Sequence, residues 1–410
     1  MTRRAAYLAF LLVAGCCCAR ADEFDSLLPG ALRDTQPLVD LRVRSQTTAQ
    51  TGFSQDAQAL LLRGRFGFRT GNLAHTSLLA EASLLTSLVS DYNSGLNGQT
   101  GYPSISDPEN NELHRLQLEN TSLPGTDLLL GRQRAPLDDQ RFVGSSNWRM
   151  NENTLDSLRI INTSVPRLTI DLTYFNRFNR RTTAASPRLG ALNGDSYLAN
   201  IRYDTPWAKV TVFDYLLSFK EMPTLSSRTA GARAVGEQPV GPVTFSYTAS
   251  WARQNDYSNN PIHYRNDYRY VDLKGSYRQF SLTLGNEVLE GNGTIGLSTP
   301  MASFHSWDGW AGAFTTTPAN GLNSRYSTVG YSAKGVGALQ RLLVAATYYD
   351  FHSDRLSRRY GSELDLQLQG SWRSVTGLVE FADFASVNNA TLGSSRSLWV
   401  EVDYLLSRGR

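Results

Sequence analysis

Cysteine is nearly absent from this 410-residue chain, and the three cysteines present occupy the consecutive positions 16–18. They lie in a segment, residues 1–21, that has the pattern of a secretion signal. Arg3 and Arg4 precede an apolar run, and Ala19-Arg20-Ala21 forms a small-residue cleavage site. The mature chain is therefore predicted to be free of cysteine, which excludes a disulfide scaffold, a cysteine–zinc site and a thiol nucleophile.

A second interpretation of the leader stays open. Val13-Ala14-Gly15-Cys16 resembles a lipobox, in which Cys16 would become a lipidated N-terminus that anchors the protein to a membrane. Signal cleavage and lipoprotein processing both lead out of the cytoplasm.

An excess of charge of one sign is also lacking once the leader is removed. The chain has 40 basic and 37 acidic residues, and Arg3, Arg4 and Arg20 belong to the leader, which leaves 37 of each. This balance excludes a globally basic nucleic-acid binder. Only four of the basic residues are lysines, and the arginine fork suits carboxylates and neighbouring acids. Any specific role of charge must therefore come from where the arginines are placed.

Long hydrophobic runs are missing after the leader, and with a mean hydropathy of −0.32 a bundle of membrane helices is not expected. The dominant period is two, which is typical of strands with unlike faces. In 362–373 and 396–407, for example, apolar residues alternate with acids and amides. Eighteen such segments are predicted, at 37–45, 58–70, 75–87, 112–121, 126–134, 154–162, 167–178, 196–204, 207–220, 228–235, 242–253, 267–275, 277–288, 321–333, 339–351, 361–373, 374–384 and 396–407.

The lengths of the connections alternate along the chain. Short links such as 122–125, 164–166 and 204–206 are separated by long polar stretches such as 88–111 and 135–153. Outer-membrane barrels have short periplasmic turns, longer outer loops and an even strand number. The sequence therefore predicts an all-β transmembrane antiparallel barrel of about 18 strands with both termini periplasmic. A soluble sandwich or propeller is the alternative, because turning the apolar face inward preserves the alternation.

The predicted domain order is a cleaved signal peptide at 1–21, a periplasmic N-terminal segment at 22–36 and an outer-membrane barrel at 37–410. Many charged residues share the polar parity that would line the lumen of this barrel. The basic members are Arg42, Arg44, Arg63, Arg65, Arg69, Arg115, Arg159 and Arg177, and the acidic members are Asp40, Glu81, Glu119, Asp171, Glu363, Asp365, Glu401 and Asp403. Two roles are open: the charges neutralise each other and brace the wall, or surplus arginine attracts an anionic solute.

Residues 131–151 carry the clearest family signal. They contain a G-R-Q strand end, a D-D-Q-R-hydrophobic-V-G loop and a W-R-x-N continuation, and further matches occur at 285–289, 299–302, 308–312, 317–322 and 398–404. This pattern resembles the alginate-export family of outer-membrane barrels. The resemblance implies an eighteen-stranded barrel with an electropositive constriction for a uronate polysaccharide, which passes unchanged. The matching basic positions are Arg132, Arg134, Arg141 and Arg149, although Asp138 and Asp139 would equally pair with Arg141 to hold a loop.

Catalytic and metal-binding motifs are missing. The five histidines form no H-E-x-x-H pattern or close pair, so neither a metal nor a cofactor is predicted. His305, Ser306 and Asp308 have the atoms of a hydrolase relay, but sequence neighbours on an extended segment cannot form one, and no enzyme is expected. The loop 289–320, rich in tryptophan, phenylalanine and glycine, either folds inward to narrow a pore or packs on other outer loops.

These observations predict a passive, substrate-selective channel of the bacterial outer membrane for anionic solutes, with export of an alginate-like acidic polysaccharide as the finer hypothesis. A general small-molecule uptake porin and a soluble or lipoprotein β-rich carbohydrate-binding protein are the alternatives. The expected partners are outer-membrane lipid, an anionic polysaccharide or small anionic solute, and periplasmic export proteins. No nucleic acid is expected.

Overall fold

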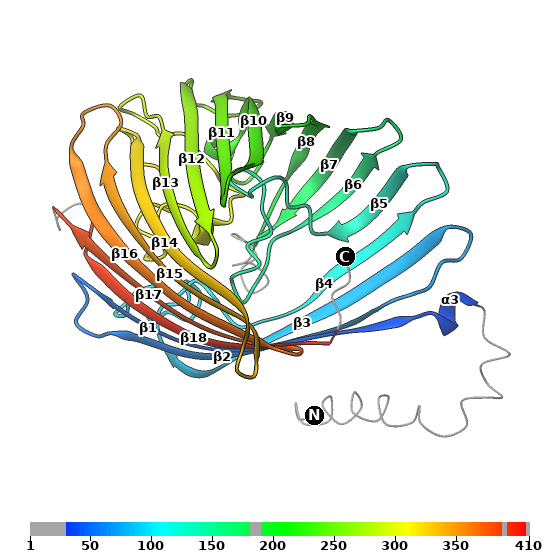
Figure 1. Cartoon of the computed structure of the whole chain (residues 1–410), viewed down its shortest axis with the longest axis horizontal. Coiled ribbons are helices and arrows are strands. Elements are labelled where there is room, and N and C mark those ends of the chain that lie inside the picture. Colours follow the sequence, from blue (N-terminus) through cyan, green and yellow to red (C-terminus); the bar gives the residue numbers. More distant parts are fainter. Residues whose placement is uncertain (1–29, 181–189, 388–391, 407–410) are drawn as a thin grey trace.

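The computed structural model describes residues 30–180, 190–387 and 392–406, in which eighteen strands form one antiparallel sheet (Figure 1). The strands are β1 (Gln36–Gln50), β2 (Ala57–Arg69), β3 (Thr76–Asp91), β4 (Asn110–Asn120), β5 (Thr126–Gln133), β6 (Thr154–Asn162), β7 (Leu168–Asn179), β8 (Ala191–Asp204), β9 (Lys209–Leu217), β10 (Ser227–Val240), β11 (Val243–Asp256), β12 (Arg265–Tyr277), β13 (Phe280–Leu289), β14 (Leu322–Val336), β15 (Leu339–His352), β16 (Arg359–Trp372), β17 (Val375–Ser386) and β18 (Ser395–Leu405).

Within the described residues, helix is confined to three short pieces, α3 (Gly30–Arg33), η1 (Pro223–Leu225) and η2 (Phe304–Ser306). Across the described ranges, none of the helices reaches the length and hydropathy that a membrane crossing needs. The predicted signal peptide at 1–21, the lipobox cysteine and residues 22–29 lie outside the described residues.

The sheet closes on itself. Each strand pairs with its neighbour in sequence, and β1 pairs with both β2 and β18, so no strand edge is left free. The predicted 18-stranded antiparallel barrel is confirmed, and the sandwich alternative is wrong. The largest differences in strand bounds are five residues each: β1 extends to Gln50, β8 begins at Ala191 and β10 extends to Val240.

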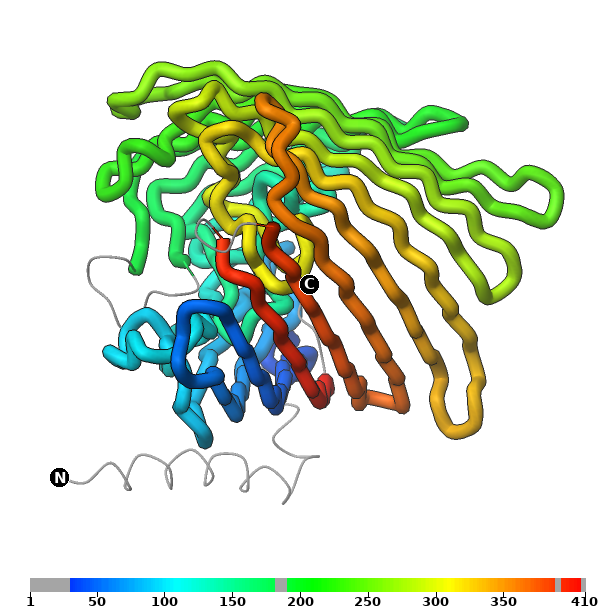
Figure 2. The backbone as a smooth tube through the Cα atoms, turned by 90° about the vertical axis from the view of Figure 1, so that its left-hand side faces the viewer, coloured from blue at the N-terminus to red at the C-terminus, as the bar shows by residue number. Residues whose placement is uncertain are grey.

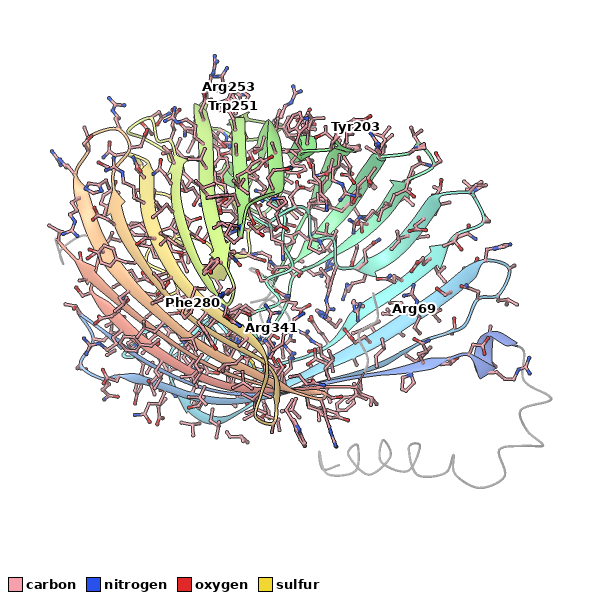
Figure 3. The ribbon with its side chains drawn as sticks, in the orientation of Figure 1. Arg69, Tyr203, Trp251, Arg253, Phe280 and Arg341 are labelled. Atoms are coloured by element: carbon pink, nitrogen blue, oxygen red, sulfur yellow. The ribbon has the colours of Figure 1, made fainter. Side chains whose placement is uncertain are left out.

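The barrel is apolar outside and charged inside. On β18, Leu398, Val400 and Val402 are 40%, 44% and 50% exposed, whereas the alternating Trp399 and Glu401 are buried. The same arrangement holds on the strands that pair with β18, because paired residues share a face. Figure 3 shows the side chains that cover the two faces of the wall. An exposed apolar band around a closed sheet is the arrangement of a barrel that sits in lipid.

The connections sort by length onto the two rims, as predicted. One rim carries turns as short as two residues, at 241–242, 278–279, 337–338 and 373–374, and the other carries the long connections 92–109, 134–153 and 290–321. In Figure 2 the tight hairpins, including the one around 337, lie at one end of the tube. The start of β1 and the end of β18 also meet at the short-turn rim, where Asp40 faces Leu405.

Candidate functional site: the bridged lumen

Two of the long connections enter the barrel. The loop 134–153 follows β5 and contacts inward side chains of β1 and β2, and the loop 290–321 follows β13 and contacts inward side chains of β16 and β17. We refer to them as loop A (134–153) and loop B (290–321). Of the two placements that the sequence left open for 289–320, the structure shows the inward one.

The two loops are joined to each other inside the lumen. The Gly144 N–H donates to the Met301 carbonyl at 2.8 Å, and the Ser146 N–H donates to the Ser303 hydroxyl at 2.9 Å. The indole ring of Trp148 stacks on the imidazole of His305, with centroids 3.4 Å apart and planes 12° apart. Loops A and B therefore form one bridge that crosses the lumen between β5–β6, which carry loop A, and β13–β14, which carry loop B.

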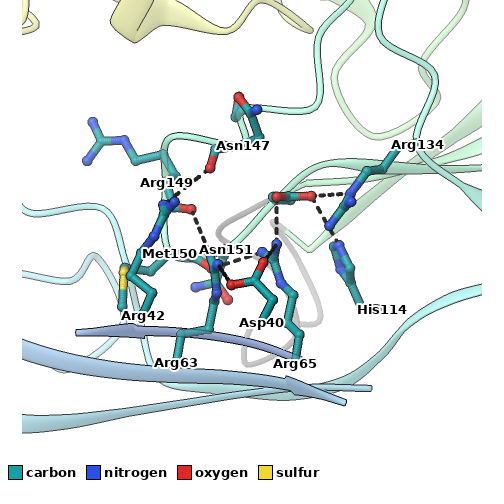
Figure 4. A network of polar contacts seen from close by, with 12 residues as sticks. Asp40, Arg42, Arg63, Arg65, His114, Arg134, Asn147, Arg149, Met150 and Asn151 are labelled. Atoms are coloured by element: carbon teal, nitrogen blue, oxygen red, sulfur yellow. Dashed lines mark hydrogen bonds and ion pairs between the residues drawn. The ribbon is translucent and has the colours of Figure 1, made fainter. Parts of the chain in front are cut away.

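Arginines of β1 and β2 hold loop A against the wall (Figure 4). Arg42 donates to Asp403 at 2.6 Å and to the Trp148 carbonyl at 2.8 Å, and Arg44 forms an ion pair with Glu401 at 2.5 Å. Arg63 donates to Asp40 at 2.7 Å. Arg44 and Arg63 are fully buried, so these guanidinium groups brace the bridge.

Glu152 at the end of loop A contacts two arginines and a histidine. Arg65 donates to it at 2.6 Å, Arg134 forms a short ion pair with it, and His114 lies 3.3 Å away. Burial by itself would raise the pKa of Glu152, but Arg134 and Arg65 outweigh burial and hold the pKa well below its usual range. Glu152 is therefore ionised and fixes the base of loop A on the wall.

Other predicted lumen charges pair along the wall. Arg115 donates two hydrogen bonds to Glu81, at 2.9 and 2.7 Å, and Arg159 pairs with Asp171 at 2.5 Å. Arg69 and Glu119 form a further ion pair near the short-turn rim. In each case an arginine neutralises a carboxylate on another strand, which is the adjacent strand for Arg115 and Arg159 and the next but one for Arg69.

Arg141 lies at the far end of loop A and is fully buried. It pairs with Glu287 of β13 at 2.7 Å and with Asp308 of loop B at 2.7 Å. Burial opposes its charge, but the two carboxylates raise the pKa of Arg141 above its usual range. Of the alternative partners from the sequence, Asp139 accepts the Arg141 backbone N–H at 3.1 Å and pairs with Arg233, and Asp138 contacts Asn200, so neither carboxylate contacts the Arg141 guanidinium. Arg141 thus ties loop A to loop B and to β13.

Two arginines expected in the lumen lie on the outer face. Arg132 is paired in register with Leu116 and Asp156, on the same face as the 56% exposed Leu130, and it forms an ion pair with Asp156 at 2.8 Å. Arg177 is shifted to that face by the β-bulge between Phe175 and Arg177. A bulge inserts one unpaired residue, so the alternation beyond it is inverted, and both lumen predictions are corrected.

Strands β16 and β17, which β18 separates from β1, present acids to loop B. The Ala311 N–H donates to Glu363 at 2.7 Å, and the Trp310 N–H lies 3.3 Å from Asp365. His305 contacts Glu380 of β17 at 3.1 Å. Sequence parity identified Glu363 and Asp365 as inward-facing. Glu380 was missed although it has the inward parity of the predicted strand 374–384.

An aromatic cluster inside the barrel was also missed. Phe213 and Tyr215 of β9 stack at 4.9 Å, and Phe142 of loop A packs on both and on Tyr268 of β12 at 5.1 Å. Phe351 of β15 belongs to the same buried cluster. The signal in the sequence was the blurred alternation in 207–220 and 339–351, where one apolar face meets lipid and the other meets the loops.

A few charged groups in the lumen keep contact with solvent. The side chains of Arg134 and Arg149 are 24% and 20% exposed, and the Arg149 guanidinium lies over the Trp148 ring at 4.8 Å. Across the lumen, a polar hollow of about 290 Å³ is lined by Arg233, tyrosines and acids. Accessible cations and a polar hollow are groups that a passing solute would meet. Within the described residues no group of three His, Cys, Asp or Glu side chains is placed to hold a metal.

Comparison with known proteins finds solved structures that share this fold. No family model and no curated protein matches the chain. Among solved structures, OccK1 (OpdK) of Pseudomonas aeruginosa matches at 16% identity over 92% of this chain and all of that one, with a TM-score of 0.70. OccK2 (OpdF), solved in complex with glucuronate, matches at 15% identity with the same coverage and a TM-score of 0.65. OccAB4 of Acinetobacter baumannii matches at 13% identity over 92% of this chain and 99% of that one, with a TM-score of 0.69.

The fold is that of an outer-membrane β-barrel porin. The exposed apolar band, which needs a lipid environment, and this porin fold place the chain in the bacterial outer membrane. The resemblance to the alginate-export family is thereby confirmed at the coarser level, as a resemblance to outer-membrane porins with eighteen strands.

Proposed function

We propose that the chain is a passive, substrate-selective channel for small anionic solutes, which cross it without chemical change. The observation that carries the proposal is the pair of solvent-accessible arginines, Arg134 and Arg149, beside the bridge that narrows the lumen. Charged side chains at a constriction select ions of the opposite sign.

The electrostatics of the bridge support a carboxylate as the recognised group. Arginines of β1, β2, β4 and loop A lie on one flank of β18, while Glu363, Asp365 and Glu380 of β16 and β17 lie on its other flank. A small solute with one carboxylate would turn that group toward Arg134 and Arg149, whose planar forks match it. OccK2 was solved with glucuronate and OpdK with vanillate, both carboxylates.

Export of an alginate-like polysaccharide remains the finer prediction from the motifs in 131–151. The bridge of loops A and B favours a small solute, because a polymer would need a continuous passage past a structure tied to both walls. By the same proposal the short-turn rim faces the periplasm, the leader at 1–21 is removed on export, and periplasmic export partners would matter only for the polymer.

Reversal potentials in planar bilayers test the anion pathway. A salt gradient across the wild-type channel should give an anion preference, and the double variant R134Q/R149Q should reduce it. R132Q is the matched control, because that arginine lies on the outer face. Cation preference in the wild type, or equal potentials in wild type and double variant, would contradict the proposal.

Solute size distinguishes a channel for small anionic solutes from an exporter of an alginate-like polysaccharide. Liposome swelling with glucuronate, with neutral glucose and with uronate oligomers of increasing length measures which of them enter. Entry of glucuronate but not of the long oligomers supports the small-solute channel. Entry of long oligomers at comparable rates would favour polysaccharide export instead.

A further inference from the structure

One sector of the short-turn rim is basic and contains no acid. It extends from the β12–β13 turn to the β16–β17 turn, and residues 273–286, 327–349 and 366–379 contain no Asp or Glu. Its basic residues are Lys274, Arg278, Lys334, Arg341 and Arg373. Within the described part of the chain, none of these five forms an ion pair. We call this sector the basic arc.

Elsewhere on the same rim, acids are present and pair with some of the basic residues. Arg69 pairs with Glu119, and Arg202 pairs with Asp204 at 3.0 Å. The basic arc is therefore a local excess of positive charge that no carboxylate of the described chain neutralises. It is left available to an anion from outside the protein.

Two turns of the arc share one construction. In the turn 277–280 the Arg278 guanidinium lies over the Tyr277 ring at 5.2 Å. In the turn 372–375 the Arg373 guanidinium lies over the Trp372 ring at 4.9 Å. Tyr277 and Trp372 are 45% and 47% exposed on the outer face. Aromatic rings of this kind mark the level of the lipid headgroups, so both arginines lie at the height of lipid phosphates.

An apolar hollow of about 500 Å³ lies on the outer wall above these turns. It extends across β13 to β17 and is lined by side chains including Phe280, Tyr331, Ala346, Leu366 and Phe381. The small side chain of Ala346 leaves the hollow open between the larger side chains that line it. Phe280 follows Arg278 by two residues, and Val344, also in the lining, is about 10 Å along β15 from Arg341 at the rise of a strand. Phe280 and Arg341 are labelled in Figure 3.

We propose that the basic arc and this hollow bind anionic glycerophospholipids from the leaflet at the short-turn rim. The phosphate of one lipid contacts Arg278 while its acyl chain occupies the hollow, and Arg373, four strands away, contacts the phosphate of a neighbouring lipid. A headgroup with net negative charge fits this site better than a zwitterionic one, because no carboxylate of the arc balances an ammonium group. The assignment uses the membrane position of the barrel and is independent of what passes through the lumen.

Native mass spectrometry of the full detergent-purified barrel tests the site. Dioleoyl phosphatidylglycerol should be retained in preference to dioleoyl phosphatidylethanolamine and phosphatidylcholine. R278Q/R373Q should weaken phosphatidylglycerol retention about fivefold for each arginine removed, which is the usual contribution of one basic residue near an anionic surface. The control R167Q removes a turn arginine of the same rim whose guanidinium lies over none of the aromatic rings in the described part of the chain, and it should retain the lipid like the wild type.

A346F, which fills the hollow without changing charge, should also reduce phosphatidylglycerol retention. Equal retention of the three lipids, or equal retention by R278Q/R373Q and R167Q, overturns the proposal. Displacement of the lipid by millimolar inorganic phosphate would also overturn it, since the arc would then bind free phosphate alone. Ion selectivity in bilayers should be unchanged in R278Q/R373Q, so failure of the lipid site and failure of the channel function give different results.

Discussion

The arginines of this lumen perform two separable tasks. Arg44, Arg63, Arg65 and Arg141 are fully buried in ion pairs and hold loops A and B in place. Only the less buried guanidinium groups of the bridge are placed to meet a solute. The two roles that the sequence left open for these charges therefore belong to different residues.

Arg141 gives the sharpest prediction at the residue scale. R141Q leaves Glu287 and Asp308 buried without their cation, which should weaken the anchoring of the loops by about 3 kcal/mol, the usual cost of breaking a buried pair from one side. Single-channel recordings should show larger or more frequent current fluctuations. R132Q, which removes an ion pair of the outer face, serves as the control, and quiet R141Q channels would contradict the anchoring role.

His305 predicts a pH dependence. Burial lowers its pKa to about 4, with Glu380 partly opposing this and Arg149 and Arg44 adding to it. Since this pKa lies below the ordinary value of 6.5, the neutral ring stabilises the Trp148 stack above about pH 6.5, and that stabilisation is lost as the pH falls toward 4. Acidification should loosen the bridge in the wild type.

The measurement is channel conductance between pH 7 and pH 4 in the wild type and in H305Q. The variant has no imidazole to protonate and should respond less to acid. An identical pH response in both proteins would assign the effect to other groups.

At the scale of elements, the bridge formed by loops A and B decides the width of the lumen. Loop B reaches β16 and β17 through Ala311 and His305, and it reaches loop A through Met301 and Ser303. Because strands β13 and β14 pair with each other over their own length, the wall does not depend on loop B. The loop is therefore removable without opening the barrel.

Trimming residues 296–316 should enlarge the conductance in planar bilayers, since the crossing between the two walls is then removed. Trimming 96–101, which belongs to the outer loop between β3 and β4, should change the conductance less. Equal conductance of the 296–316 variant and the wild type would show that loop B does not restrict the ion path.

At the scale of the whole molecule, the decisive property is the inversion of the two faces. Leu366 on β16 points outward and is 40% exposed. Its neighbour Gln367 points inward, and its side-chain amide donates a hydrogen bond to the Glu380 carboxylate at 2.9 Å. The same substitution at the two positions therefore meets lipid in one case and a carboxylate in the other.

L366R should destabilise the barrel by about 2–4 kcal/mol, the cost of arginine on a lipid face near the bilayer midplane. Q367R should cost much less, because Glu380 faces it. Samples of the wild type and the two variants are heated to increasing temperatures and run on gels without boiling. The temperature at which the band of the folded barrel disappears measures this difference in stability. Equal losses would argue against lipid at the Leu366 face.

Most of the fold was predictable from the sequence, because period-two alternation and loop parity are local properties. The eighteen strands and the two rims follow from them, as does the lumen position of Arg42, Arg63 and Glu81. Arg132 and Arg177 were misplaced because a bulge and an uncertain register invert the parity, and a bulge depends on the partner strand. Glu380 and the inner aromatic cluster were overlooked for a different reason, since their role depends on loops that cross the lumen.

The sequence by itself determined an exported, cysteine-poor chain whose alternating strands demand a closed sheet between lipid and water. Only the tertiary structure decided which arginines are bracing and which are accessible, because Glu152 and Asp308 of loops A and B and Glu287 of β13 are brought to them from distant parts of the chain. The physical reason is that the alternation of apolar and polar residues is a local property, which tells the two faces of one strand apart. The neutralisation of a charge is a long-range property, because it depends on every segment that folds against the charged residue.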